Sequence, residues 1–240
     1  MKCTLYHADT RKTLDDLLAD AERQAGAWKD PKPSPGAPKP VTPLERFTAV
    51  KDLYMAIDRP FGNLMYSLIR ATGAQTVVEF GTSFGISTIF LAAAVRDNGA
   101  GKVLTTEFIP EKVETAKKNL TKAGLVDLID FRIGDALQTL KDPMPGPVDF
   151  VFLDGEKSMY LDVLKALEPQ MKPGCLIAAD NTDQDGTKTF LEYIREPDNG
   201  YMTSPLLTLG GTKPESGHEI SVRIIAVVPP LGPVDLFDHP

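Results

Sequence analysis

From Thr76 to Ala179 the chain alternates short, continuously apolar runs with segments of helical periodicity. Continuously apolar strands are typical of a parallel sheet that is buried on both faces. The alternation therefore predicts an α/β fold with a doubly wound, Rossmann-like and mostly parallel sheet, right-handed crossovers and helices on both faces. The expected strands are Thr76–Phe80, Lys102–Glu107, Ile129–Ile133, Val148–Asp154 and Gly174–Ala179. The expected helices between them cover residues 85–97, 110–123, 136–140 and 159–170.

The segment before this alternation has a different character. Helical spacing at residues 10–28 is followed by six prolines within residues 30–43, which predict an extended connector. Two further helices are expected at Leu44–Ile57 and Phe61–Ala71. Gly73 supplies the stop signal for the second of these helices.

The segment after the alternation predicts the end of the sheet. A helix is expected at residues 187–196, and the β-like runs Ser204–Leu209 and Glu219–Val228 are joined by a loop rich in glycine and proline. These runs predict a C-terminal antiparallel hairpin that completes a seven-stranded sheet. We therefore expect an N-terminal helix and Pro-rich connector at residues 1–43 and one α/β domain at residues 44–240.

Composition narrows the class of partner. The formal net charge of −7 leaves no basic stripe to neutralise phosphates, which argues against nucleic acid and anionic membrane surfaces. The only cysteines are Cys3 and Cys175, so a disulfide framework is not expected. An apolar signal core and a membrane-spanning stretch are also missing. We expect a soluble, cytoplasmic protein with a small-molecule substrate.

The first predicted strand leads into a turn that is suited to a ligand. The turn Gly81–Gly85 lacks the G-x-G-x-x-G spacing of dinucleotide sites, and Glu79 would repel a phosphate there. A carboxylate suits a ligand with an ammonium group and no phosphate, such as S-adenosylmethionine. Glu107 ends the next strand, at the spacing where an acidic side chain takes ribose hydroxyls, and Asp135 with Ala136 could flank an adenine. Alternatively, the glycines only permit a tight turn and Asp135 caps a helix.

Oxygen ligands follow two later strands of the predicted sheet. Asp154 ends one apolar run, and Asp180 and Asn181 follow the next. If these strands are neighbours, about 4.8 Å apart, the three side chains could share one ion at the carboxyl edge of the sheet. Oxygen donors are the preference of a hard divalent cation such as Mg²⁺. An Asp-Asn pair by itself is also common turn chemistry.

Lys157 follows Asp154 by three residues, near the start of the next predicted helix, where the helix dipole disfavours a cation. A bound metal ion nearby would favour the neutral amine, which could then accept a proton from a phenolic hydroxyl. The alternative is an ordinary solvent-exposed lysine. The histidines, His7, His218 and His239, are isolated in the sequence and are expected on the surface or in loops.

At these residues the chain resembles the cation-dependent O-methyltransferases, the group that contains catechol and caffeoyl-coenzyme A O-methyltransferases. The similarity runs from about Phe61 to Val228. The family's strand V-x-E-x-G-T/A and its helix start G-x-S are matched by Val77–Thr82 and Gly85–Ser87. The family's F-[IL]-D-x-x-K-x-x-Y is matched by Phe152–Tyr160, and its [VA]-D-N by Ala179–Asn181.

The resemblance implies a role for each matched residue. Four residues would hold the methionine end of S-adenosylmethionine: Glu79, Gly81, Thr82 and Ser87. Glu107 would hold the ribose. The metal ligands would be Asp154, which also lies near the cofactor, Asp180 and Asn181, and Lys157 would be the catalytic base.

Departures from the family pattern concern the substrate. Ile86 stands where relatives often have an aromatic residue, and Glu156 stands where some place a tryptophan beside a planar substrate. Many bacterial members read G-D-G-L near the end of the sheet, whereas this chain has Gly217–Ile220, so Glu219 could approach the substrate. In relatives the N-terminal region covers the active site or forms a dimer, and residues 1–43 could do either.

The predicted function is thus methyl transfer from S-adenosylmethionine to one hydroxyl of a small vicinal diol, assisted by Mg²⁺ or another divalent cation, in a homodimer. Alternatives are a methyltransferase of the same fold that acts on a non-catechol natural product or a sugar, and a non-catalytic S-adenosylmethionine-binding protein. A nicotinamide oxidoreductase is disfavoured by Glu79 and by the missing glycine triplet.

Overall fold

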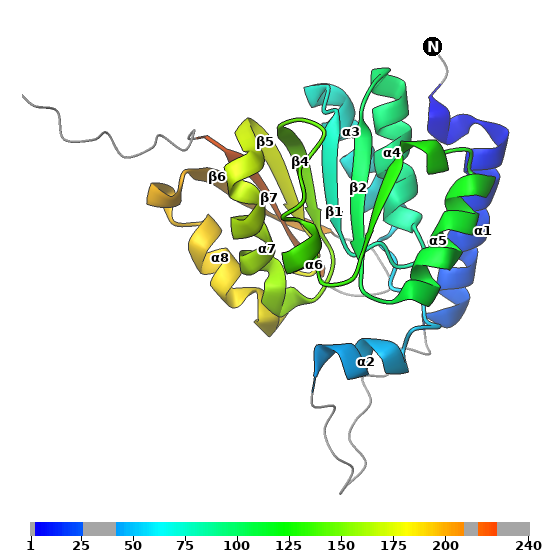
Figure 1. Ribbon diagram of the computed structural model, residues 1–240, viewed down its shortest axis with the longest axis horizontal. Coiled ribbons are helices and arrows are strands. Elements are labelled where there is room, and N and C mark those ends of the chain that lie inside the picture. Colours follow the sequence, from blue (N-terminus) through cyan, green and yellow to red (C-terminus); the bar gives the residue numbers. More distant parts are fainter. Residues whose placement is uncertain (1–2, 26–41, 209–215, 225–240) are drawn as a thin grey trace, which may run out of the picture.

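The computed structural model describes residues 3–25, 42–208 and 216–224 (Figure 1). Its helices are α1 Ala8–Gln24, α2 Pro43–Ala49, α3 Arg59–Thr72, α4 Ile86–Asn98, α5 Pro110–Lys122, α6 Ala136–Thr139, α7 Tyr160–Leu167 and α8 Lys188–Ile194. Its strands are β1 Thr76–Phe80, β2 Lys102–Glu107, β3 Ile129–Ile133, β4 Val148–Leu153, β5 Met171–Ala179, β6 Tyr201–Thr208 and β7 Ser216–Arg223.

The strands form one seven-stranded sheet in the order β3-β2-β1-β4-β5-β7-β6. Strands β1 to β5 pair in parallel, and β7 pairs antiparallel with both β5 and β6. This arrangement confirms the predicted α/β class, the doubly wound parallel sheet and the C-terminal antiparallel hairpin. Strands β2 and β3 are added on one side of β1, and β4 and β5 on its other side. The position between β1 and β4 is therefore a topological switch point, where open α/β sheets bind ligands.

Apolar side chains pack on both faces of the sheet, which explains why the strands are continuously apolar. On one face Val77, Phe150 and Phe152 pack with buried residues of α1, α3, α4 and α5. On the other face Val78 and Val151 pack with residues of α6, α7 and α8. Figure 1 shows these two helical layers on either side of the strands.

Local sequence signals place the helices that frame the site. The Asp58 carboxylate accepts a hydrogen bond of 2.8 Å from the Phe61 amide and thereby caps α3. Gly73 ends α3 in the left-handed region, at φ 64°, as its stop signal predicts. Helix α4 is buried from Ile86 to Val95, because it packs against α3, α1 and β2.

The predicted helix at residues 44–57 is wrong in its second half. Helix α2 begins at a capping box between Thr42 and Glu45 and ends at Ala49. Residues 51–58 are not helical, and Tyr54 is held by a 3.1 Å hydrogen bond from its amide to Gln24 Oε1. Apolar residues of this segment pack on the α/β core, and that tertiary contact outweighs local helical periodicity.

Other differences concern the ends of elements. Strand β4 ends at Leu153, so Asp154 follows the strand, and β5 begins earlier than expected, at Met171. The hairpin strands β6 and β7 also begin earlier than predicted. Parts of several predictions lie outside the described residues: the end of the helix at 10–28, most of the Pro-rich connector, Leu209, residues 225–228 and His239.

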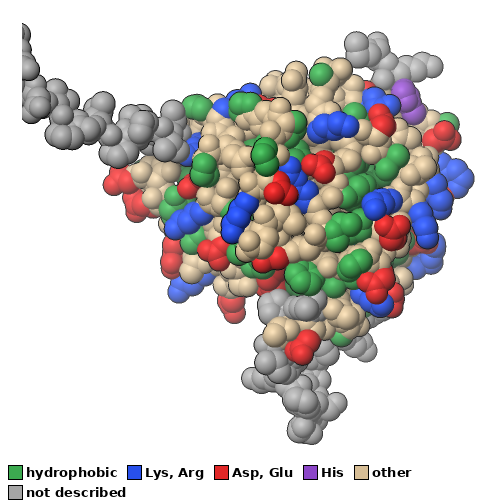
Figure 2. Space-filling model, viewed as in Figure 1, with side chains coloured by type: hydrophobic (Ala, Val, Ile, Leu, Met, Phe, Trp, Pro, Cys, Tyr) green, Lys and Arg blue, Asp and Glu red, His purple; other side chains and the backbone are tan. Residues whose placement is uncertain are grey.

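The first residues of the described chain pack on the α/β unit. Thr4 donates from its hydroxyl to Asp97 Oδ1 at 2.5 Å, and the Thr10 hydroxyl donates to the Ala123 carbonyl at 2.9 Å. On the face drawn in Figure 2, basic and acidic side chains are interspersed. Among the described residues, no helix combines the length and the apolar character that crossing a bilayer requires.

Candidate functional site

The loops after β1 and β4 converge at the carboxyl edge of the sheet. The Asp154 amide donates to the Phe80 carbonyl at 2.9 Å, and the Asp180 amide donates to the Leu153 carbonyl at 2.9 Å. These bonds extend the strand pairing one residue beyond β4 and β5. Gly81 adopts φ 108°, and a Cβ atom there would lie 2.7 Å from the Asp154 carbonyl oxygen. A glycine is therefore required for the two loops to approach each other.

Glu79 and Ser87 are brought together, as predicted. Glu79 is 0% exposed, and its Oε1 accepts a 2.6 Å hydrogen bond from the Ser87 hydroxyl. Its Oε2 accepts from the hydroxyls of Thr88 and Thr105, each at 2.6 Å. Burial raises the pKa of Glu79, although the three hydroxyls oppose that shift. Thr82 is buried in the same cluster, with its hydroxyl 2.5 Å from that of Thr105.

Glu107 lies at the end of β2 and organises the neighbouring turns. Its two carboxylate oxygens accept from the amides of Ser83 and Ile109, each at 2.9 Å. Ser83 has φ 47°, a left-handed conformation that is uncommon for a residue with a side chain. Glu107 therefore holds the β1–α4 turn in place, and its carboxylate remains partly exposed at the same edge.

Asp135 and Ala136 lie at the end of β3, next to Glu107. The Gly134 amide donates to the Glu107 carbonyl at 2.9 Å. Asp135 accepts from the Leu137 amide at 2.9 Å and caps α6, which is the helix-capping alternative considered above. The last residue of β3, Ile133, is apolar and 45% exposed.

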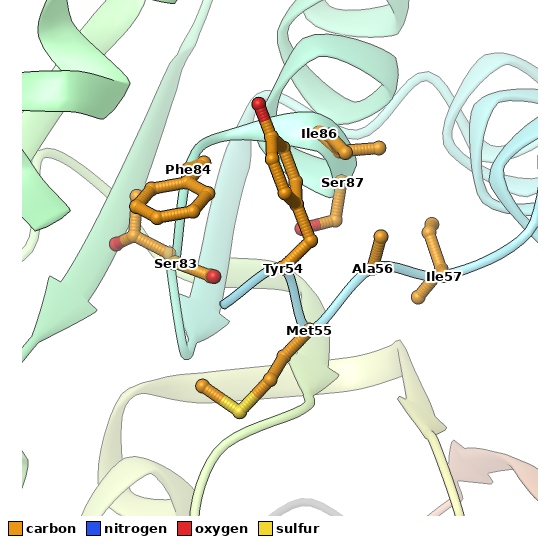
Figure 3. A pocket seen from close by; sticks show the side chains of 9 residues that line it. Tyr54, Met55, Ala56, Ile57, Ser83, Phe84, Ile86 and Ser87 are labelled. Atoms are coloured by element: carbon orange, nitrogen blue, oxygen red, sulfur yellow. The ribbon is translucent and has the colours of Figure 1, made fainter. Parts of the chain in front are cut away.

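A pocket lies between the β1–α4 turn and the segment that precedes α3 (Figure 3). Its lining joins the predicted cofactor residues Thr82 and Ser87 to Tyr54, Met55 and other residues of that segment. The Tyr54 ring packs edge-on against Phe84, with ring centroids 4.7 Å apart. Residues 54–57 were not predicted to line the site, because their apolar spacing resembles that of a helix. Asp58 and Pro60 together form a helix-start signal for α3. This signal indicated that any preceding helix must end before residue 58.

Asp154 and Asp180 stand at neighbouring positions after β4 and β5. Burial and the adjacent Asp180 raise the pKa of Asp154 to about 8, although Lys157 opposes that shift. Burial would also raise the pKa of Asp180, but hydrogen bonding by His218 and the charge of Lys157 bring it below its ordinary value. Asn181 has φ 51°, and its amide donates to Asp180 Oδ1 at 2.8 Å.

Lys157 is a largely buried lysine, with a side chain 14% exposed. Its Nζ lies 3.1 Å from Asp154 Oδ1 and donates to the Tyr160 hydroxyl at 2.7 Å. The Tyr160 hydroxyl in turn donates to the Asp180 carbonyl at 3.0 Å. The structure therefore brings the predicted base beside the predicted oxygen donors, and the solvent-exposed alternative for Lys157 does not hold.

The expectation for His218 is wrong. His218 is only 4% exposed, its Nδ1 lies 2.7 Å from Asp180 Oδ1, and its ring stacks on Phe61. The expectation that Glu219 could approach the substrate is not supported either. Glu219 is 0% exposed, and Arg195 contacts both of its carboxylate oxygens, at 3.1 and 2.7 Å. Successive side chains of a strand point to opposite faces of the sheet. The side chain of His218 therefore lies beside Asp180, and that of Glu219 points to the other face, toward Arg195.

The β4 loop is also joined to α2. Arg46 forms an ion pair with Glu156, and Lys51 just after α2 lies 2.9 Å from Glu111 at the start of α5. These contacts place the N-terminal part of the described domain against the carboxyl edge of the sheet. Figure 1 shows α2 beyond the ends of the strands, at the bottom of the view.

The chain matches known proteins at the level of sequence. The sequence model of the O-methyltransferase family matches residues 34–199. A catechol O-methyltransferase from Niastella koreensis is 34% identical over 139 residues, which are 57% of this chain and 62% of that protein. Caffeoyl-CoA O-methyltransferase 1 from Eucalyptus globulus is 34% identical over 158 residues, or 64% of this chain and 63% of that protein. The matches thus span a little less than two thirds of these relatives.

Solved structures match over more of the chain. The O-methyltransferase TomG from Streptomyces achromogenes, involved in tomaymycin synthesis and solved in complex with SAM, has a TM-score of 0.65 and 28% identity. That match covers 72% of this chain and 84% of TomG. Cofactor-bound Rv0187 from MTB has a TM-score of 0.67 and 26% identity, covering 85% of this chain and 95% of that chain. Together with the site geometry, these matches show that the chain belongs to the O-methyltransferase family.

Proposed function

We propose that this chain transfers the methyl group of S-adenosylmethionine to one hydroxyl of a small vicinal diol of the catechol type, with the assistance of a divalent cation. The observation that carries the proposal is the juxtaposition of Lys157, Asp154 and Asp180 beside the glycine turn after β1. Family membership and the relatives named for catechol and caffeoyl-CoA methylation support the acceptor class.

The cofactor is proposed to lie along the ends of β1, β2 and β3. Glu79, Gly81, Thr82 and Ser87 would surround its methionine end, where the pocket of Figure 3 opens. Glu107 would accept hydrogen bonds from the ribose hydroxyls. The adenine would lie near Asp135 and Ala136. Phe108 and Ile133, which are 49% and 45% exposed beside Glu107, offer it apolar contact.

The donor set fits a hard cation. The carboxylates of Asp154 and Asp180 are largely buried and follow neighbouring strands, and Asn181 adds an amide oxygen as a third donor. Within the described ranges, no group of three or more His, Cys, Asp or Glu side chains is placed to hold a metal ion. A site with two carboxylates suits Mg²⁺, which keeps several positions for water or substrate. A bound Mg²⁺ would act as a Lewis acid on the acceptor's oxygens.

Lys157 is proposed as the general base. In its neutral form, Nζ would take the proton of the acceptor's hydroxyl. The deprotonated oxygen of the acceptor would then displace the sulfur of the cofactor from the methyl carbon, and the electron pair of the broken bond would stay on that sulfur, giving a neutral thioether. The contacts of Lys157 with Asp154 and Tyr160 orient the amine for this transfer.

The test is a methyl-transfer assay on chelator-treated protein, with labelled S-adenosylmethionine and with or without added Mg²⁺. Catechol and resorcinol form a matched pair of acceptors, since only the hydroxyls of catechol are adjacent. We expect Mg²⁺-dependent methylation of catechol and little of resorcinol. Equal turnover of the two diols would refute the vicinal-diol assignment, and turnover unaffected by chelation would refute the cation. Cofactor binding without turnover on any diol would favour the other acceptor classes or a binding protein.

The oligomeric state and the cellular compartment are separate proposals from the sequence. We propose a cytoplasmic homodimer, as the family resemblance and the composition of the sequence imply. Sedimentation of the purified full chain tests the dimer, and a monomeric, active protein would contradict it.

A further inference from the structure

His218 occupies a built position beside the candidate cation site. Its Nδ1 lies 2.7 Å from Asp180 Oδ1, and the side chain is 5% exposed. The ring stacks on Phe61 of α3, with centroids 3.9 Å apart and planes inclined by 16°. An imidazole that stacks on Phe61 and is almost fully buried has little freedom to turn away from the carboxylate.

The segment that carries His218 is tied to the loop that carries Asp180. The Thr182 amide donates to the Gly217 carbonyl at 2.8 Å, and the Gly217 amide donates to Asp183 Oδ1 at 3.1 Å. These two bonds flank the contact between His218 and Asp180. The start of β7 and the loop after β5 therefore form one unit, in which the distance from imidazole to carboxylate is set by the backbone.

Only one of the two Asp180 oxygens is engaged by this unit. Asp180 Oδ1 receives the Asn181 amide at 2.8 Å and faces His218 Nδ1 at 2.7 Å. A carboxylate oxygen that faces two nitrogen groups is poorly available to a metal ion, whereas Oδ2 takes no part in these two contacts and can face the ion. Groups that hydrogen-bond to a metal ligand fix its orientation, and their removal typically weakens metal binding.

We propose that His218 is a positioning residue for the cation site: its Nδ1–H holds Asp180 Oδ1, so that Asp180 presents Oδ2 to the divalent cation beside Asp154. This inference rests on the cation dependence in the proposed function. It assigns a role to a histidine that stands where many bacterial relatives have the aspartate of G-D-G-L. It also predicts that Asp180 contributes one oxygen rather than two.

Two substitutions of His218 distinguish the effect of its Nδ1–H group from that of its ring packing. H218F keeps an aromatic ring on Phe61 but removes the N–H group. H218N places an amide nitrogen near the position of Nδ1 but removes the ring. Mg²⁺ binding to chelator-treated, full-length protein is measured by calorimetry, and S-adenosylmethionine binding serves as the folding control. We expect H218F to lose about 10–100-fold in Mg²⁺ affinity, while H218N stays close to wild type.

Each outcome decides between the claims. If wild type binds Mg²⁺ and H218F binds it equally well, the role of His218 is refuted and the proposed function stands. If H218N loses as much affinity as H218F, ring packing rather than the donor matters, and the inference also fails. If wild type binds no divalent cation, both the inference and the cation dependence fail. Should H218F lose the cofactor as well, H218A replaces it, because alanine adds no bulk.

Discussion

The two halves of the carboxyl edge provide hydrogen-bond and charged partners for their carboxylates in different ways. At the cofactor edge, formed by the ends of β1 to β3, the partners are neutral: three hydroxyls for Glu79 and two backbone amides for Glu107. At the cation edge, formed by the ends of β4 and β5 and the start of β7, Asp154 and Asp180 face Lys157 and His218. Neutral donors hold a geometry at any ordinary pH. At the cation edge two carboxylates adjoin each other and the Lys157 ammonium, so this edge depends on protonation and on bound ions.

The largest expected effect comes from removing the amine at the cation edge. Lys157→Met should lower turnover by about 10²–10⁴-fold, because the base is lost, while S-adenosylmethionine affinity changes little. Single-turnover methylation and calorimetry measure the two quantities. Lys165→Met, on the exposed side of α7, is the matched control and should keep wild-type turnover. Wild-type turnover of the Lys157 variant across pH 6–9 would show that another group is the base.

A smaller effect is expected at the cofactor edge. Glu107→Gln keeps the size of the side chain but removes the charge that would receive the ribose hydroxyls, together with one of the two oxygens that accept the amides of Ser83 and Ile109. A hydrogen bond to a charged group contributes about 1.5–3 kcal/mol, so S-adenosylmethionine affinity should fall by about 10–150-fold and Mg²⁺ affinity should stay unchanged. Glu111→Gln, an exposed change nearby, is the control. A parallel loss of Mg²⁺ affinity would mean that the two edges are coupled.

The last prediction concerns the stability of the cation-free protein rather than turnover or affinity. The pKa of Asp154 is raised to about 8 from an ordinary value of 3.8. A raised carboxyl pKa stabilises the fold fully at a pH below the unfolded value, and this contribution is lost as the pH rises through the folded value. The Asp154 contribution should therefore decline between about pH 4 and pH 8, by at most about 1.4 kcal/mol per pH unit.

Urea unfolding of wild type and Asp154→Asn at pH 5 and pH 8, without divalent ions, measures this contribution. Asn cannot ionise, so the variant should lose less stability than wild type over that interval. Added Mg²⁺ should recover stability at pH 8 in wild type only. If the stability of the two proteins changed equally with pH, the pKa of Asp154 would not be raised in the folded state. The contrast between the two edges would then be smaller than proposed.

Regular alternation made most of the fold predictable. The central strands were predicted to within a few residues because burial on both faces leaves a continuous apolar run in the sequence. The candidate donors Asp154 and Asp180 were predicted for a related reason, since they directly follow such runs. The segment at residues 50–58 was not predicted, because its apolar spacing resembles that of a helix while its conformation depends on contacts with Gln24 and Phe84.

The sequence by itself determined the order of strands and helices along the chain, the polar residues that follow the central strands and the family. These features depend on local runs of polar and apolar residues. Each can be recognised without knowing which residues are its neighbours in the folded sheet. Only the tertiary structure decided that His218 lies against Asp180 and that Glu219 turns to Arg195. Those contacts join residues 38 positions apart in the first case, and they depend on the antiparallel register of β7 on β5, which no local pattern encodes.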